Sequence, residues 1–398
     1  MIKKIILAVG VLSSFTLASF GSDIATVLNV KAFGGQYSYE GESASNGNLN
    51  IDFVPAMKFS DKFSFLPALY VEYRGVKDVT ELVGGEKLLQ QSASYNLSLR
   101  PVYKIGENTK LRAKVGYFKQ MIIEAKDESW GNGAFDYAKT SVGLDVSKKN
   151  INIGYSMYII AFPNYASLVS QTSGQFGVSA TDIGKNLLDF MANEVSLYGK
   201  FYPLSGFVVD WSFAYTMKSF NDQTIQLDNG VYNASQKRAD TVMGVGLFPS
   251  FAIVPTGPLT MFGGLSINYV SNASNQNRYD TAKKQFIEKD YDYTETKIAP
   301  IISFSFNTVP LKLDFSYEIG SRAYLNRLVQ DVAGVYGTDK IKTDTTYLSL
   351  GLTYPLSEKL SLKGIYGSYN SSSSMKYEQV YKYTYQTSNM FLGVAYEL

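Results

Sequence analysis

Apolar side chains alternate with polar ones along most of this chain, and this period of two limits the possible folds more than any other feature. From Leu49 to Phe59 every second residue is apolar or proline, and after a short polar turn the pattern continues from Phe63 to Tyr73. Successive side chains of a β-strand point to opposite faces of the sheet. The pattern therefore predicts strands with one apolar and one mostly polar face, and it recurs as far as Tyr354.

Short turns and longer connections alternate between these segments. The short turns lie at 60–62, 106–109, 148–150, 204–206, 255–258, 308–310 and 357–359. The longer connections lie at 40–47, 75–91, 124–136, 163–191, 221–238, 271–290, 325–341 and 371–383. Seven turns and eight loops join 16 strands, and no linker or change of composition divides them. The sequence therefore predicts one all-β domain over residues 22–398.

The first 21 residues have the pattern of a secretory signal peptide. Lys3 and Lys4 precede an uncharged apolar run from Ile5 to Leu17, and small residues follow as far as Gly21. The alternative is a membrane anchor, but the run is shorter than the roughly 20 residues that a spanning helix needs. We expect cleavage after Gly21 and export of residues 22–398 from the cytoplasm.

The composition excludes several kinds of chemistry. The chain has no Cys and no His, so it has neither a thiolate metal site nor a Ser-His-Asp triad. Its net charge is only +2, whereas nucleic-acid binding requires a concentrated basic surface. We therefore expect no enzyme activity, no cofactor and no nucleic-acid partner. Two acidic loop clusters match no defined calcium loop and are interpreted as solvated surface: Glu124, Asp127, Glu128 and Asp136, and Glu288, Asp290, Asp292 and Glu295.

The apolar faces could meet each other in a soluble sandwich or meet lipid in a barrel. Strands of about 12 residues, with short turns on one side and long loops on the other, favour a transmembrane barrel, which needs about 9–11 residues per strand. Aromatic residues also occupy the apolar face near the expected membrane boundaries. They are Phe59, Phe63, Tyr103, Phe207, Phe306, Tyr354 and Tyr396 near the turns, and Tyr73, Tyr215, Tyr269 and Tyr317 near the loops.

The last nine residues resemble the terminal assembly signal of Gram-negative outer-membrane β-barrels. Met390, Leu392, Val394, Tyr396 and Leu398 share one face, although that class usually ends in Phe. The resemblance is porin-like and points to no particular family. It implies recognition by the barrel-assembly machinery, contact with outer-membrane lipids, and a possible homo-oligomer. The predicted fold is a transmembrane antiparallel up-and-down β-barrel of about 16 strands, with short periplasmic turns and longer extracellular loops, in the bacterial outer membrane.

A barrel of 16 strands leaves an aqueous channel, so the polar face becomes the lining of a pore. The strand parity predicts 13 inward basic residues, namely Lys58, Arg74, Arg100, Lys104, Arg112, Lys114, Lys139, Lys200, Lys218, Lys297, Lys312, Arg322 and Lys363. It predicts eight inward acidic residues, namely Asp52, Glu72, Asp145, Asp210, Glu295, Asp314, Glu318 and Glu397. The excess of +5 favours a weak anion preference. The alternative is that these charges are solvated or paired with one another.

Two local features leave alternatives open. The longest connection, residues 163–194, could fold inward and narrow the pore, or it could form a short helix on the rim with Ile183, Leu187, Phe190 and Met191 on one face. Five prolines fall inside predicted strands, namely Pro55, Pro67, Pro101, Pro249 and Pro300. Proline lacks a ladder donor, so these positions mark strand ends or bulges, or else a weakened seam.

The function favoured by the sequence is a porin-like channel for passive diffusion of small hydrophilic solutes. The alternatives are a structural or surface-adhesion barrel that transports nothing, and a gated channel for hydrophobic molecules.

Overall fold

The computed structural model describes residues 23–77, 90–123, 128–165, 186–253, 258–306, 308–379 and 382–398. The predicted signal peptide, residues 1–21, lies outside these ranges. Within the ranges, no helix combines the length and the apolar character that crossing a bilayer requires.

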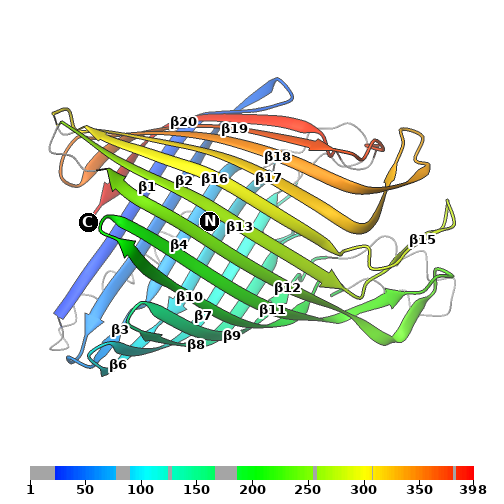
Figure 1. Cartoon of the computed structure of the whole chain (residues 1–398), viewed down its shortest axis with the longest axis horizontal. Coiled ribbons are helices and arrows are strands. Elements are labelled where there is room, and N and C mark those ends of the chain that lie inside the picture. The colour runs from blue at the N-terminus through cyan, green and yellow to red at the C-terminus, as the bar shows by residue number, and fades with distance from the viewer. Residues whose placement is uncertain are drawn as a thin grey trace.

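One antiparallel sheet closes on itself to form a barrel (Figure 1). Its strands are β1 (Asp23–Tyr39), β2 (Glu42–Lys58), β3 (Phe63–Phe65), β4 (Ala68–Lys77), β5 (Gln90–Leu99), β6 (Pro101–Gly106), β7 (Thr109–Ile123), β8 (Tyr137–Lys148), β9 (Ile151–Ala161), β10 (Phe190–Leu204), β11 (Phe207–Gln226), β12 (Tyr232–Ile253), β13 (Leu259–Ser274), β16 (Tyr293–Phe306), β17 (Leu311–Gln330), β18 (Tyr336–Pro355), β19 (Leu360–Ser373) and β20 (Tyr385–Glu397). β3 and β4 are two segments of one barrel strand, as are β5 and β6. The predicted barrel of about 16 strands is therefore confirmed.

The first and last strands join the ends of the sheet. β1 pairs with β20 in a register that runs from Asn29↔Glu397 to Tyr39↔Thr387. A closed sheet has no unpaired edge, so the backbone groups of the wall are hydrogen-bonded around the barrel. Two further strands, β14 (Arg278–Asp280) and β15 (Gln285–Ile287), pair only with each other.

All predicted short turns fall between two barrel strands, although the turn at 255–258 lies mostly outside the described residues. Three of the predicted loops, 40–47, 221–238 and 325–341, are wrong in extent, because most of their residues are strand. Ladder pairing continues to Tyr39↔Glu42 in β1–β2, to Gln226↔Tyr232 in β11–β12 and to Gln330↔Tyr336 in β17–β18. The hairpins project beyond the barrel (Figure 1). There their side chains lose the apolar alternation while the backbone ladder persists.

The outer surface carries an apolar belt. On β17, Phe315, Tyr317 and Ile319 are exposed, and the next residue on that face is Ser321, which lies opposite Asp344. The run from Leu311 to Ile319 on this strand therefore has the roughly 9–11 residues with which a tilted strand crosses hydrocarbon. The same surface includes the predicted assembly residues, with Leu392 on β20 64% exposed. In one closed sheet no second sheet faces this belt, so the sandwich alternative is wrong.

All five strand prolines lie where the ladder with one neighbouring strand is interrupted. Pro67 falls between β3 and β4, and Pro101 begins β6 directly after a gap. The β12–β13 register omits Pro249, and the β16–β17 register omits Pro300. Pro55 is paired in the β1–β2 ladder, but on the other side of β2 it lies between Phe53, which pairs with β4, and Met57, which pairs with β3. Pairing resumes beyond each interruption. The prolines therefore mark strand ends or local irregularities rather than a weakened seam in the barrel.

Candidate functional site

The charged residues predicted to face the lumen form ion pairs largely with one another. Seven of the eight acidic residues pair with predicted inward bases: Glu72 with Arg74, Asp145 with Arg112, Asp210 with Lys200, Glu295 with Lys297 and Arg322, Asp314 with Lys312, Glu318 with Lys297, and Glu397 with Lys363. Several of these pairs bridge neighbouring strands, and side chains that meet across a ladder lie on the same face. That face is opposite to the apolar belt.

On the wall formed by β16 to β20, carboxylates neutralise the lumen cations. Glu295 pairs with Arg322 and lies 3.3 Å from the Nζ of Lys297. The same Lys297 Nζ lies 3.5 Å from Glu318 on β17. Lys312 contacts Asp314 at 2.9 Å on its own strand. This part of the wall therefore contributes little net charge.

Four cations on the wall formed by β5 to β11 have no such partner. Within the described ranges, Arg100, Lys114, Lys139 and Lys218 form no ion pair with a carboxylate, and we refer to them as the unpaired cation group. Lys114 lies close enough to Arg100 and Lys139 for their charges to repel. The excess of positive charge that the sequence predicts is thus concentrated on one side of the lumen.

Two remaining predicted bases lie near the short-turn end. Lys58 contacts Asp61 at 2.7 Å, and Lys104 lies at the end of β6. The hydrogen bond from Lys58 and its positive charge lower the pKa of the Asp61 carboxyl in the turn. Asp52, the eighth predicted inward acid, lies opposite Asn29 in the β1–β2 ladder.

Glu194 is a lumen residue that was not predicted, because residues 163–194 were expected to form a loop. Glu194 belongs to β10, where it lies opposite Ser156, and it accepts a hydrogen bond from Thr216 Oγ1 at 3.2 Å. Its charge acts on Lys114 and Lys139. Asp240 lies opposite Lys218 in the β11–β12 ladder and is a second acidic neighbour, but Arg238 binds it. Two acids therefore lie among five bases, namely the unpaired cation group and Arg238, which leaves an excess of +3.

The expected helix near the end of this connection is wrong over the residues that the structure describes. Residues 186–188 form a turn, and β10 begins at Phe190, so Phe190 and Met191 point to opposite faces of a strand. Ile183 and the rest of 166–185 lie outside the described residues. The predicted inward folding of 163–194 is therefore not tested by the structure.

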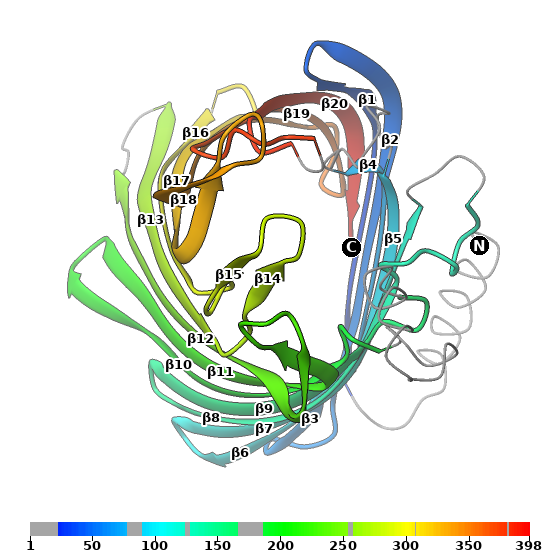
Figure 2. The same ribbon diagram turned by 90° about the vertical axis from the view of Figure 1, so that its right-hand side faces the viewer.

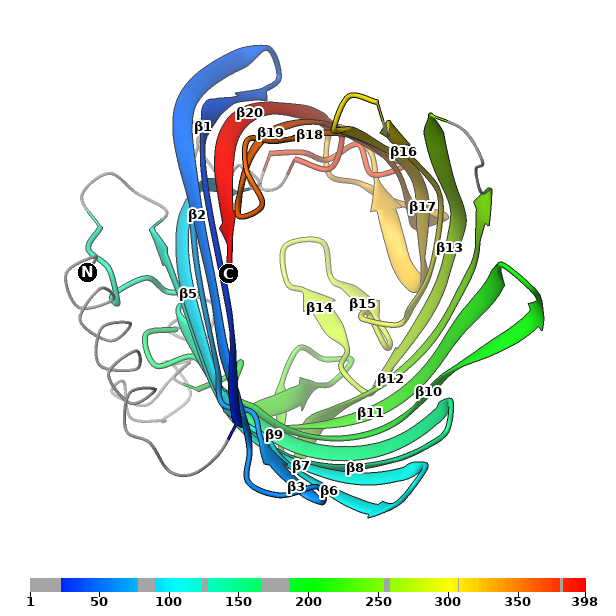
Figure 3. The same cartoon turned by 90° about the vertical axis from the view of Figure 1, so that its left-hand side faces the viewer.

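A different connection folds toward the lumen. Residues 275–292, which join β13 to β16 and contain β14 and β15, lie within the outline of the barrel in both axial views (Figures 2 and 3). We call this segment the inner hairpin. It lies at the end of the barrel that carries the long hairpins (Figure 1). Its turn is exposed and contains Lys283 and Lys284.

Two arginines fix the base of the inner hairpin to the barrel wall. Arg327 on β17 binds Asp290 in bidentate fashion, with Nη2 2.9 Å from Oδ2. Arg238 on β12 binds Asp240 in the same way, with Nη2 2.6 Å from Oδ2. Both guanidinium groups contact the ring of Tyr291, at 4.0 Å for Arg238 and 5.4 Å for Arg327. Charged hydrogen bonds and cation–π contacts therefore meet at one residue of the segment.

Further hydrogen bonds hold the inner hairpin at residues on either side of Tyr291. Asp292 accepts a hydrogen bond from the Ser274 N–H at 2.6 Å, and burial raises the pKa of its carboxyl. The Tyr336 hydroxyl, beyond the apolar belt, donates to Asp280 at 3.0 Å. Burial and this bond raise the pKa of Tyr336 to about 12. The hairpin is thus bonded to β13 and β18, so it lies in a defined position at the mouth.

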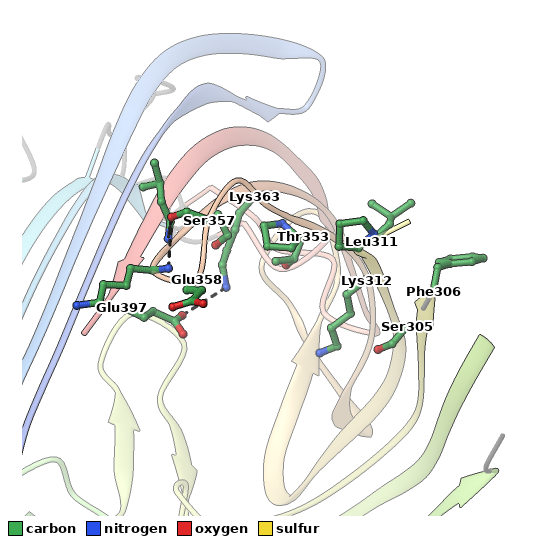
Figure 4. A pocket seen from close by; sticks show the side chains of 14 residues that line it. Ser305, Phe306, Leu311, Lys312, Thr353, Ser357, Glu358, Lys363 and Glu397 are labelled. Carbon is green, nitrogen blue, oxygen red and sulfur yellow. Dashed lines mark hydrogen bonds and ion pairs between the residues drawn. The ribbon is translucent and has the colours of Figure 1, made fainter. Parts of the chain in front are cut away.

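A pocket opens at the opposite, short-turn end of the barrel (Figure 4). Lys312, Lys363, Glu358 and Glu397 line it, and Lys363 Nζ lies 4.0 Å from Glu397. Both charge signs are present, so the pocket does not select either one. It belongs to the rim of the lumen.

The acidic loop clusters do not form a metal site in the described part of the chain. Asp290 is paired with Arg327, Asp292 accepts a backbone N–H, and Glu295 is paired with Arg322. Their oxygens are therefore engaged by the protein. The first cluster falls partly outside the described residues, since it includes Glu124 and Asp127.

Comparisons with known proteins give structural likeness alone. No family model and no curated protein matches the chain. Similar solved structures include OccAB4 of Acinetobacter baumannii (12% identity, TM-score 0.48, covering 94% of this chain and 98% of that one). Others are the in-vitro folded outer-membrane protein OmpT of Vibrio cholerae (11%, 0.47, 96% and 99%) and OccK2 (OpdF) of Pseudomonas aeruginosa (12%, 0.47, 94% and 98%). Values this low assign no family, so function is inferred from the residues of this chain.

A closed antiparallel barrel with an apolar belt outside and paired charges inside can satisfy its backbone groups and still face hydrocarbon. These features define a porin-like β-barrel of the bacterial outer membrane.

Proposed function

We propose that this barrel is a channel through which small hydrophilic solutes diffuse passively, with a weak preference for anions. The observation that carries the proposal is the unpaired cation group, Arg100, Lys114, Lys139 and Lys218, which faces the lumen. Its two acidic neighbours are Glu194 and Asp240, and Asp240 is bound by Arg238. A lumen surface of one sign raises the local concentration of counter-ions. Sixteen-strand barrels are wide enough to hold water. The proposal involves no catalysis and no cofactor.

A planar-bilayer recording under a salt gradient tests this proposal. We expect ohmic current steps and a reversal potential of the sign that anion preference gives. The double variant Lys114→Gln/Lys139→Gln should move the reversal potential toward that of a non-selective pore, because it removes two of four unpaired cations. Lys342→Gln is the matched control, since Lys342 pairs with the exposed Asp344 away from the lumen group. Cation selectivity of the wild type would contradict the anion preference.

The same recording separates the alternatives. Silence across salts and voltages would overturn the channel and favour a structural or adhesion barrel. Uptake of a labelled fatty acid only by cells that carry the gene would favour a gated channel for hydrophobic molecules.

Three partners form part of the proposal: the barrel-assembly machinery, membrane lipids and other copies of the chain. The outward row Met390, Leu392, Val394, Tyr396 and Leu398 is exposed, which supports recognition of β20 by the barrel-assembly machinery. The exposed apolar belt supports contact with lipids and with other copies of the chain.

A further inference from the structure

Two lysines of the unpaired cation group lie against aromatic rings on the lumen wall. Lys139 on β8 places its Nζ 3.8 Å from the ring centroid of Tyr158 on β9. Lys218 on β11 places its Nζ 5.5 Å from the ring of Phe190 on β10. The two rings are 6.4 Å apart in an edge-on arrangement. Two cations and two rings therefore form one continuous patch across four neighbouring strands.

The ladder registers explain how the patch is assembled. Tyr158 and Lys218 lie on either side of Ala192 in one cross-strand row. Lys139 and Phe190 lie on either side of Ile160 in the next row. Charged and aromatic side chains thus alternate diagonally. Ala192 is fully buried and too small to separate Tyr158 from Lys218.

The patch differs from the other cation–ring contacts of the lumen, because its cations have no carboxylate. Arg238, Arg322 and Arg327 also contact aromatic rings, and each is paired with an acid. Two carboxylates are near the patch. Asp240 is bound by Arg238, and Glu194 accepts a hydrogen bond from Thr216. Within the described ranges, neither forms an ion pair with Lys139 or Lys218.

A solute that carries a carboxylate on a flat ring complements this patch. The carboxylate would meet an ammonium group, and the ring would pack on Tyr158 and Phe190 in the offset or edge-on geometry that aromatic pairs prefer. A solute with only one of these features would use half of the patch. Because a channel must also release what it binds, the site needs only modest affinity.

We propose that Lys139, Tyr158, Phe190 and Lys218 form a low-affinity binding site for aromatic carboxylates on the lumen wall. The inference deepens the proposed function, because it names a class of anion that the open lumen would favour.

Equilibrium dialysis of the refolded barrel in detergent against radiolabelled benzoate measures binding without requiring a current. We expect benzoate to bind about tenfold more tightly than acetate, which lacks the ring, or benzyl alcohol, which lacks the charge. Lys139→Gln/Lys218→Gln should abolish this preference. Tyr158→Leu should remove the preference over acetate while leaving the reversal potential unchanged. Lys312→Gln, which removes a lumen lysine already paired with Asp314, should bind benzoate as the wild type does.

The outcomes separate this inference from the proposed function. Equal binding of benzoate and acetate, or a benzoate preference that survives the Lys139 and Lys218 substitutions in folded barrels, would overturn the inference. Circular dichroism establishes that each variant is folded. Selective benzoate binding by a barrel that conducts no current would support the binding site and contradict the proposed channel function. Current without selective benzoate binding would support the channel function and contradict the binding site.

Discussion

Single residues decide where the inner hairpin lies. Tyr291 contacts two guanidinium groups, and each guanidinium is held by a carboxylate. Of these groups Asp290 has only 2% of its side chain exposed, so its charge depends on Arg327 rather than on water. A buried carboxylate that loses its partner keeps the cost of desolvation without the compensating attraction.

Replacing Arg327 by Leu should therefore release the inner hairpin. Breaking a buried pair in this way costs roughly 3–5 kcal/mol, which is large for one short segment. We expect faster tryptic cleavage after Lys283 and Lys284 and noisier open-channel current, with the barrel still folded. The control is Lys237→Leu, which removes a half-exposed pair with Asp222 worth about 1 kcal/mol or less. Equal cleavage rates in Arg327→Leu and in the wild type would show that the pair does not hold the segment.

At the scale of secondary-structure elements, the inner hairpin is a separate unit inserted between two regular barrel strands. β13 and β16 pair along their length from Leu259↔Phe306 to Asn272↔Tyr293, without help from β14 or β15. Their ladder therefore persists if the hairpin is shortened. The free-energy cost of changing a loop length is small, on the order of 1 kcal/mol.

Replacing residues 278–287 by a short Gly-Ser linker should accordingly widen the mouth and leave the barrel intact. We expect a higher single-channel conductance and a free energy of unfolding within about 1 kcal/mol of that of the wild type. An insertion of the same linker in the turn at 148–150, at the other end of the barrel, is the control. If conductance stays the same after the replacement, the hairpin does not limit the current.

The elements that the sequence predicted, and those it missed, differ in one physical respect. Alternation reveals a strand only where one of its faces meets hydrocarbon, so the barrel strands and their short turns could be predicted. Above the belt the ladders of β11–β12 and β17–β18 continue with polar and apolar residues that no longer alternate, so the sequence predicted loops there.

Only part of the candidate site could be predicted, because a local pattern shows which face a residue occupies but not which residue it contacts. Strand parity identified the charged residues of the wall, but pairing depends on neighbours that are distant in sequence. Asp290 and Arg327 are separated by a whole strand, and nothing local marks their contact. Glu194 was not predicted as a lumen residue because the apolar spacing from Ile183 to Met191 favoured a helix, which concealed the start of β10 at Phe190.

At the scale of the whole molecule, the two faces of the sheet meet different solvents, and this difference should be measurable as stability. Leu350 and Ser349 are neighbours on β18; Leu350 lies in the exposed apolar belt, and Ser349 points to the opposite face. Leu350→Arg should lower the free energy of unfolding from phospholipid vesicles by about 2–4 kcal/mol, the cost of a charge in the middle of the bilayer. Ser349→Arg should change it by less than about 1 kcal/mol. Denaturant titration in vesicles makes the comparison, and equal effects would contradict the assignment of the two faces.

Pairing of β1 with β20 also dictates when assembly can be completed. The eleven register pairs from Asn29↔Glu397 to Tyr39↔Thr387 join the first and last strands of the described chain. The barrel therefore cannot close until β20 has been synthesised and has paired with β1. Until then β1 and β20 are edge strands whose backbone N–H and C=O groups are unpaired, and such edges promote aggregation. We therefore expect the exported chain to need chaperones that cover these two edges until the barrel closes.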